Sequence, residues 1–254
     1  MKNTLPQKTF LLGGYDLEML TIKHMLEDSK DCIILDKHLR WDNAFLSAYQ
    51  DELKGEAYPM IFGIELQEDV PVPNNYYRID HHNDWSDKPS SLEQVAVIIG
   101  VKLNRHQQLV AANDKGYIPA MERLDATKEE ISDIRRQDRR AQGISSVDEA
   151  LAAKSIETNL SRHGDLLVVK SYSQSFSPIC DTLFPFKNLL IYSDTEWVFY
   201  GEGKGKLADQ FSHEITLKRM YHGGGENGYV GTVKNEYNTD EIAIFVEQLK
   251  KEYE

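Results

Sequence analysis

The sequence predicts an α/β protein with a mainly parallel sheet flanked by helices, followed by a smaller mixed α/β domain. Short apolar runs alternate with helical periodicity through the first half of the chain, which is typical of βα units. A charged stretch poor in large apolar residues follows, and strand-like runs resume after Gly164. Because 254 residues can bury two cores, we expect domains at residues 1–125 and 164–254, joined by a helical connector at 126–163.

The elements of the first domain follow from where the apolar runs begin and end. We expect strands at 8–12, 32–35, 59–64 and 76–79, and helices from Asp16 onward and at 41–53. A capping box, Ser90 with Glu93, opens the next helix. The segment 103–114 extends or follows that helix.

Two further capping boxes predict helices in the connector, with a break near Gly143. They are Thr127 with Glu130 and Ser146 with Glu149. The run RRQDRR at 135–140 is expected to be an exposed helix face. In the second domain we expect strands at 165–173 and on both sides of the turn 193–195, and a last helix capped by Asn238.

Charge and composition exclude several classes of protein. A net charge of -12 argues against a protein that coats long nucleic acid, because such binding neutralises many phosphates with Lys and Arg. It fits either a solvated acidic surface or a chain that gathers carboxylates around divalent ions. No apolar run approaches bilayer length and no signal-peptide pattern opens the chain. With two unpaired cysteines, Cys32 and Cys180, the expected setting is cytoplasmic, without a membrane partner.

Acidic and imidazole side chains gather where the predicted strands end, and the carboxyl ends of parallel strands share one crevice. Carboxylates with imidazole suit manganese, magnesium or iron better than structural zinc. Taken singly, each acid has a plainer explanation, such as a helix start for Asp16 or a turn for Asp114. Such an explanation does not suit the adjacent triplet at 80–82, because three polar groups ending an apolar strand seldom share a purely structural role. The candidates are Asp16, Glu18, Glu65, Asp80, His81, His82 and Asp114.

The triplet in RIDHH resembles the signature of the DHH phosphoesterase superfamily, which includes exonucleases, dinucleotide phosphodiesterases, exopolyphosphatases and manganese-dependent pyrophosphatases. The family's H-x-x-x-D-x-D motif after a strand corresponds to residues 12–18. Its single Asp after a strand corresponds to Glu65, and its Asp after the following helix to Asp114. The stretch HGGGENGYVG at 222–231 is similar to the family's substrate-contacting GGG loop.

The resemblance implies a metal site with one incomplete neighbour. One ion would be held by Glu18, Glu65, His81 and Asp114, and a second would keep Asp16 and the shared Glu65. Leu12 stands where the family has a metal-binding His, Glu18 and Glu65 replace Asp, and Glu226 stands where the loop often has His. Asp80 would orient an imidazole and His82 would contact the scissile phosphate. The residues expected to bind substrate are His222, Gly223, Gly224, Gly225, Glu226 and Tyr229.

The expected function is a metal-dependent phosphoesterase that hydrolyses a short oligonucleotide or cyclic dinucleotide with metal-activated water, using one or two Mn²⁺ or Mg²⁺ ions. The rival, favoured by Leu12, is a non-catalytic nucleotide- or phosphate-binding protein. A pyrophosphatase or exopolyphosphatase is the weaker alternative, since only Arg78 and Lys115 lie near the motifs to clamp so charged a substrate. The partner would be a small phosphorylated substrate or short nucleotide, and the resemblance allows a homodimer.

Overall fold

The chain forms two compact units that divide between Gly143 and Ile144, and each is described by itself. The structure is a computed structural model that describes residues 7–29, 31–54, 57–224 and 228–254. The first unit holds a parallel sheet with helices and the second a mixed sheet with helices, so the predicted α/β class is confirmed.

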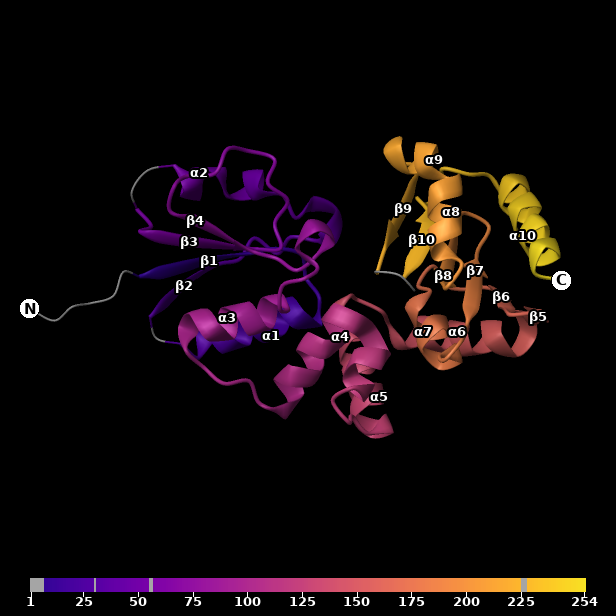
Figure 1. Cartoon of the computed structure of the whole chain (residues 1–254), viewed down its shortest axis with the longest axis horizontal. Helices are drawn as coiled ribbons and strands as arrows, with labels where there is room; N and C mark the ends of the chain where they lie inside the picture. Colours follow the sequence, from indigo (N-terminus) through magenta and orange to yellow (C-terminus); the bar gives the residue numbers. More distant parts are fainter. Residues whose placement is uncertain (1–6, 30, 55–56, 225–227) are drawn as a thin grey trace, which may run out of the picture. The chain divides into compact units, whose positions relative to one another are not determined.

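A four-stranded, wholly parallel sheet forms the centre of the first unit (Figure 1), in the order β2-β1-β3-β4. All four strands match apolar runs of the sequence. Because the strands are parallel, their carboxyl ends lie at one edge of the sheet. The strands are β1 (Lys8–Leu12), β2 (Cys32–Leu35), β3 (Met60–Ile64) and β4 (Tyr76–Ile79).

The helices of the first unit begin at side-chain caps. Asp16 accepts a hydrogen bond from the Met19 amide at the start of α1, and Ser90 forms the predicted capping box with Glu93 at the start of α3. A separate helix, α4, follows after Asn104 and is kinked at Gly116 and Tyr117. The helices are α1 (Leu17–Glu27), α3 (Ser91–Ile99), α4 (Arg105–Glu122) and α5 (Lys128–Ala141).

The prediction of one helix at 41–53 is wrong. The segment forms two short 3₁₀ turns, η1 (Trp41–Asn43) and η2 (Leu46–Tyr49), and a single α-turn, α2 (Gln50–Leu53). The interruption lies at Phe45, which is extended and pairs with Gln67 in an isolated bridge. The segment nevertheless buries Leu46 and Tyr49 against Leu11 and Ile61 of the sheet.

A six-stranded mixed sheet forms the second unit, in the order β5-β6-β7-β8-β10-β9, with β6 parallel to β7 and the other neighbours antiparallel. Its core joins the sheet to the last helix, where Trp197 stacks on Phe245 at 4.0 Å. The strands are β5 (Leu160–His163), β6 (Leu166–Lys170), β7 (Asn188–Tyr192), β8 (Trp197–Gly201), β9 (Met220–Gly223) and β10 (Tyr229–Thr232). The helices are α6 (Ser146–Asn159), α7 (Ser177–Leu183), α8 (Lys204–Gln210), α9 (Ser212–Thr216) and α10 (Thr239–Tyr253), the last capped by Asn238 as predicted.

The predicted connector contains the two helices α5 and α6, one in each unit. The box Thr127–Glu130 is confirmed, but the second box is Ser145 with Asp148, one residue earlier than predicted. The run at 135–140 is not simply an exposed face, because Arg135 and Asp138 are buried. None of the helices within the described residues is long and apolar enough to cross a membrane.

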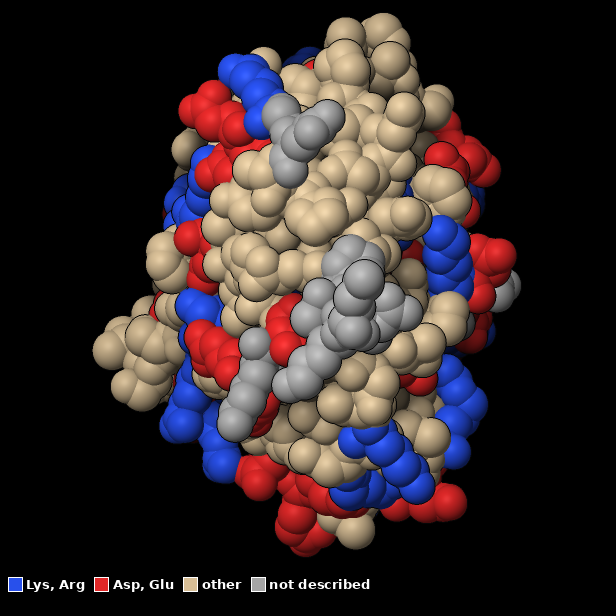
Figure 2. Space-filling model, turned by 90° about the vertical axis from the view of Figure 1, so that its left-hand side faces the viewer, with Lys and Arg blue, Asp and Glu red and all other residues tan. Residues whose placement is uncertain are grey.

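The negative charge of the chain does not form one continuous acidic surface on the face seen in Figure 2. Acidic and basic residues lie side by side along the edges of that face, and the upper part of its middle shows neither. Four carboxylates, those of Asp16, Glu18, Glu65 and Asp138, are buried inside the first unit. Burying carboxylates is costly unless something compensates their charge.

Candidate metal centre

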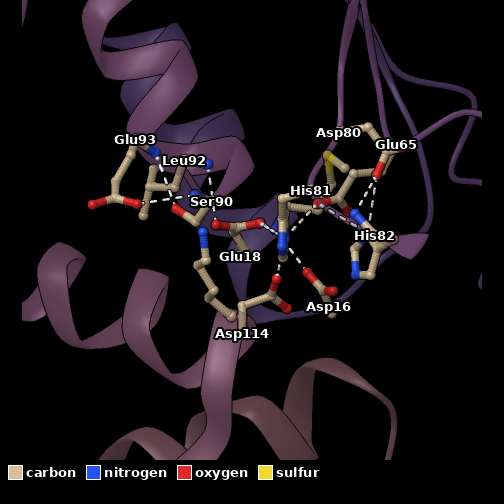
Figure 3. A network of polar contacts seen from close by, with 12 residues as sticks. Asp16, Glu18, Glu65, Asp80, His81, His82, Ser90, Leu92, Glu93 and Asp114 are labelled. Carbon is tan, nitrogen blue, oxygen red and sulfur yellow. Dashed lines mark hydrogen bonds and ion pairs between the residues drawn. The ribbon is translucent and has the colours of Figure 1, made fainter. Parts of the chain in front are cut away.

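The side chains predicted from the strand ends come together around His81 in the first unit (Figure 3). His81 follows β4, Glu65 follows β3, Glu18 lies in the first turn of α1, and Asp114 lies on α4. The Nε2 atom of His81 is 2.6 Å from Asp114 Oδ2 and 3.4 Å from both Glu18 Oε2 and Glu65 Oε1. Four elements that are far apart in sequence therefore supply one cluster.

Five atoms of this cluster are buried without a hydrogen-bond partner, and none of the close approaches to His81 has the direction of a hydrogen bond. They are Glu18 Oε2, both carboxylate oxygens of Glu65, His81 Nε2 and Asp114 Oδ2. Buried polar atoms in native proteins are almost always satisfied. Buried oxygen and imidazole atoms that gather within a few ångströms, without hydrogen-bond partners, are what a bound divalent cation requires.

The pKa values show how strongly this cluster demands positive charge. Burial raises the pKa of Asp16 well above its usual range, and the nearby carboxylates of Asp114 and Glu65 raise it further. Burial and Asp114 likewise raise the pKa of Glu18. Burial alone would lower the pKa of His81, but the carboxylates of Asp114, Glu18 and Glu65 raise it to about 12. Without a metal ion, His81 is therefore the cation that the carboxylates share.

An unusual backbone conformation places Glu65 in the cluster. Glu65 has a φ of 51°, in the left-handed region that a residue with a Cβ seldom adopts. Gly13 makes this possible: a Cβ there would lie 2.5 Å from the Glu65 carbonyl oxygen and also against that of Ile64. Strain of this kind is usually kept at functional sites.

Asp16 and Glu18 have structural roles as well as places beside the cluster. Asp16 is the N-cap of α1, which is the plainer role considered for it from sequence. Glu18 uses Oε1 to accept a hydrogen bond from the Leu92 amide in the first turn of α3, at 3.0 Å, and leaves Oε2 facing His81. One carboxylate thus joins α1, α3 and the site.

Asp80 holds the second histidine. Its Oδ1 accepts a hydrogen bond from the His82 amide at 2.9 Å and lies 3.2 Å from Nδ1 of the same imidazole. Burial alone would lower the pKa of His82, but Asp80 and Glu65 raise it. The predicted orienting role of Asp80 therefore has a defined partner, and Nε2 of His82 is left for another contact.

His82, which the sequence analysis expected at the scissile phosphate and not as a ligand, also lies in the ligand cluster. Among the residues the structure describes, the group of His, Asp and Glu atoms that lie within 4.8 Å of one another is formed by Glu65, His81, His82 and Asp114. Its position next to His81 was the only signal, and alternation along a strand would have turned it away. Leu12 is fully buried and supplies no ligand atom.

A buried network behind Asp114 was also missed. Arg135 of α5 donates a hydrogen bond to the side-chain oxygen of Asn113 at 2.9 Å and pairs with Asp138 at 2.7 Å. Arg135 also lies 4.6 Å from the ring of Tyr117, at the kink of α4. These contacts fix the part of α4 that carries Asp114. The composition of the RRQDRR run gave no sign of them.

The predicted substrate loop lies in the second unit, between β9 and β10. His222 is exposed, Gly224 has a φ of 70°, and the ring of Tyr229 lies 6.0 Å from that of Tyr221 and 6.3 Å from that of Tyr200. Tyr221 and Tyr229 are each 38 % exposed, so an aromatic surface flanks the loop. Gly223 is described as the last residue of β9, whereas Gly225 and Glu226 lie outside the described residues.

The donor set fits the divalent cation that the DHH resemblance implies. Glu18, Glu65, His81 and Asp114 offer three carboxylates and one imidazole, the buried unpartnered atoms belong to these residues, and His82 adds a fifth donor nearby. Hard oxygen ligands with few imidazoles favour Mn²⁺ or Mg²⁺ over structural zinc.

We expect Mn²⁺ binding to release at least one proton per ion at neutral pH, because His81 is protonated in the metal-free protein and must become neutral to act as a ligand. Isothermal titration calorimetry in buffers with different ionisation enthalpies measures this release. The affinity should rise with pH, since protons and the metal compete for His81, Asp16 and Glu18. Binding without proton release would show that the ion does not use His81.

Several solved structures are similar to this chain, and two of them are described here. A pGpG-specific phosphodiesterase, PggH, from Vibrio cholerae has a TM-score of 0.52 at 11% sequence identity, with 98% of this chain and 99% of that chain covered. The DHH domain of a member of the s1p family of ribosomal proteins has a TM-score of 0.58 at 10% identity, with 96% and 87% covered. No protein-family model matches the chain, and no curated protein matches its sequence.

The fold agrees with the family that the sequence resembles. It is similar to the fold of a solved DHH domain, as the triplet Asp80-His81-His82 led us to expect. The triplet lies where the parallel strands of that fold end, inside a carboxylate cluster.

Proposed function

We propose that this protein is a metal-dependent phosphoesterase that hydrolyses small phosphodiesters, such as a short oligonucleotide or a cyclic dinucleotide. The observation that carries the proposal is the cluster of buried, unpartnered ligand atoms around His81, beside a second histidine held by Asp80. Similarity in fold to a pGpG-specific phosphodiesterase supports the substrate class.

In this proposal Glu18, Glu65, His81 and Asp114 hold Mn²⁺ or Mg²⁺, with Asp16 beside them. Such an ion, when bound, stabilises charge on phosphoryl oxygens and activates water. His82 contacts the scissile phosphate. Asp80 fixes the ring through Nδ1 and raises the pKa of His82, which favours the protonated form that donates from Nε2 to a phosphate oxygen.

The test is phosphate-ester hydrolysis with added Mn²⁺ over a panel of linear dinucleotides, cyclic dinucleotides, short oligonucleotides and pyrophosphate. We expect turnover of a phosphodiester that falls more than about a hundredfold in Asp114→Ala, because that variant loses a ligand in contact with His81. Asp31→Ala, which removes an exposed carboxylate before β2, is the matched control and should keep full activity. Equal rates in the two variants would contradict the proposed site.

A second candidate function is a non-catalytic nucleotide- or phosphate-binding protein, and Leu12 is the observation that favours it. The side chain is fully buried and apolar where the resembling family has a metal-binding histidine, so a second ion has few ligands. The same panel separates the two functions. Nucleotide binding by the folded protein without hydrolysis of any substrate would favour the binding protein.

A pyrophosphatase or exopolyphosphatase has less support, because the two basic residues nearest the motifs are engaged. Arg78 donates to Glu68 at 2.8 Å, and Lys115 donates to the Lys88 carbonyl. A densely charged substrate needs cations that are free to clamp it. The homodimer that the family resemblance allows stays a prediction, and sedimentation analysis measures it directly.

A further inference from the structure

A pocket of about 400 Å³ lies directly beside the metal centre within the first unit. It is lined by the segment that begins at Trp41, by the end of β4 and by the turn η3 (Asn83–Trp85). Glu65 and His82 belong both to the pocket wall and to the ligand cluster. A substrate whose phosphate contacts His82 therefore has its neighbouring group in or near this pocket. Its size is within the range of small-molecule sites.

Trp41 forms an aromatic wall of the pocket. Trp41 is 47 % exposed, although a large indole is normally well buried. The ring is edge-on to His82, with 5.3 Å between ring centroids. Gly14 supports it from behind, because a Cβ at position 14 would lie 3.0 Å from the indole and 3.1 Å from the Trp41 backbone. Trp41 is thus held in place and yet open to a ligand.

The other tryptophan of the pocket, Trp85, is already covered by cations. The guanidinium of Arg78 lies 5.4 Å from its ring centroid and the ammonium of Lys88 lies 4.0 Å from it. Arg78 is also fixed by its ion pair with Glu68. Trp85 therefore positions Arg78. Of the two tryptophans of the pocket, Trp41 is the one left open for stacking, and it is more exposed than Phe45, the other aromatic ring of the wall.

The charge of the pocket selects against a second phosphate. Its wall includes four carboxylates, those of Glu65, Glu68, Asp80 and Asp84. Against them the wall has a single Arg or Lys side chain among the described residues, that of Arg78. An anion would be repelled here, whereas an uncharged aromatic ring with N–H groups can stack on the indole and donate to carboxylates. Nucleobases have this combination, and stacking on an aromatic side chain suits any of them.

We propose that this pocket is a nucleobase subsite in which Trp41 stacks on the base next to the phosphate at the metal centre. The inference rests on the proposed function for the placement of that phosphate. It deepens that function by making the substrate a nucleotide ester and by excluding pyrophosphate and polyphosphate as preferred substrates.

The test compares two probes in the presence of Mn²⁺, guanosine 5′-monophosphate and ribose 5-phosphate, by calorimetry. Base stacking on one aromatic side chain should make the nucleotide bind about fivefold to a hundredfold more tightly than the sugar phosphate. Trp41→Ala should remove this difference and leave the affinity for ribose 5-phosphate unchanged. Trp41→Phe should restore most of it, and Tyr77→Ala, which removes a half-exposed aromatic ring outside the pocket, should have no effect.

Equal binding of the nucleotide by wild type and Trp41→Ala would overturn the subsite, as would a wild type that binds both probes equally or fails to bind the nucleotide. The phosphoesterase proposal fails separately. A base preference that depends on Trp41, in a protein that hydrolyses no phosphodiester, would keep the subsite and reject the enzyme. Hydrolysis of dinucleotides with the same KM in wild type and Trp41→Ala would do the reverse.

Discussion

His81→Ala is expected to lower Mn²⁺ affinity and phosphodiester hydrolysis by more than about a hundredfold. The imidazole lies within 3.4 Å of carboxylate oxygens from Glu18, Glu65 and Asp114, so its loss removes the one ligand that contacts every other predicted ligand of the ion. Calorimetric titration with Mn²⁺ and steady-state hydrolysis measure the two effects. His24→Ala, an exposed histidine on α1, is the matched control and should resemble wild type in both.

The same substitution should destabilise the metal-free protein by about 3 kcal/mol, because it leaves buried carboxylates without their shared cation. The pKa of His81 is raised from 6.5 to about 12 in the folded protein, so its contribution is full below pH 6.5 and declines as pH rises toward 12. Urea unfolding of wild type and His81→Ala should therefore show a difference that shrinks with increasing pH. Unchanged Mn²⁺ affinity in His81→Ala would contradict the assigned centre.

Gly13→Ala is expected to lower the free energy of unfolding by about 3 kcal/mol and to disrupt metal binding as well. The added methyl group would lie 2.5 Å from the Glu65 carbonyl oxygen, and backbone must move to relieve the contact. Glu65 has a left-handed φ, so a backbone shift there also moves both of its carboxylate oxygens away from His81. Urea unfolding and Mn²⁺ titration measure the two losses.

Gly205→Ala is the matched control for this effect. A Cβ at Gly205 meets no atom within 4 Å, and the residue lies in α8, where alanine favours helix. Its stability should equal or exceed that of wild type. A Gly13→Ala protein with wild-type stability and Mn²⁺ affinity would show that the turn after β1 does not constrain Glu65.

The sequence predicted the strands of the first sheet because each is a short apolar run with a polar end. It failed at 41–53, where apolar spacing suits a helix but Phe45 pairs with Gln67, a contact between distant segments. It also missed β5, β9 and β10 as strands. β5 is short, polar and at the edge of its sheet, and β9 is recognisable only by its pairing with β10.

The convergence of the site could be predicted, but its geometry could not. Parallel topology brings residues 65 and 81 to one edge of the first sheet, and Asp114 reaches them from α4. The left-handed Glu65, the inclusion of His82 and the Arg135 contact to Asn113 depend on backbone angles and packing that local patterns do not encode. From sequence, Trp41 was predicted only as the start of a helix. Its exposure beside His82 in the structure is what suggests that it stacks on a base.

The replacement of Asp by Glu at position 18 looks like damage in the sequence. In the folded chain the extra methylene lets the Glu18 carboxylate make two contacts. One oxygen accepts a hydrogen bond from the Leu92 amide, 74 residues away in sequence, while the other faces His81. The carboxylate thus connects the start of α3 with the metal centre. We expect that the shorter side chain of Asp could not make both contacts. The position of Glu18 therefore depends on the docking of α3, and a bound ion would stabilise α3 in its docked position.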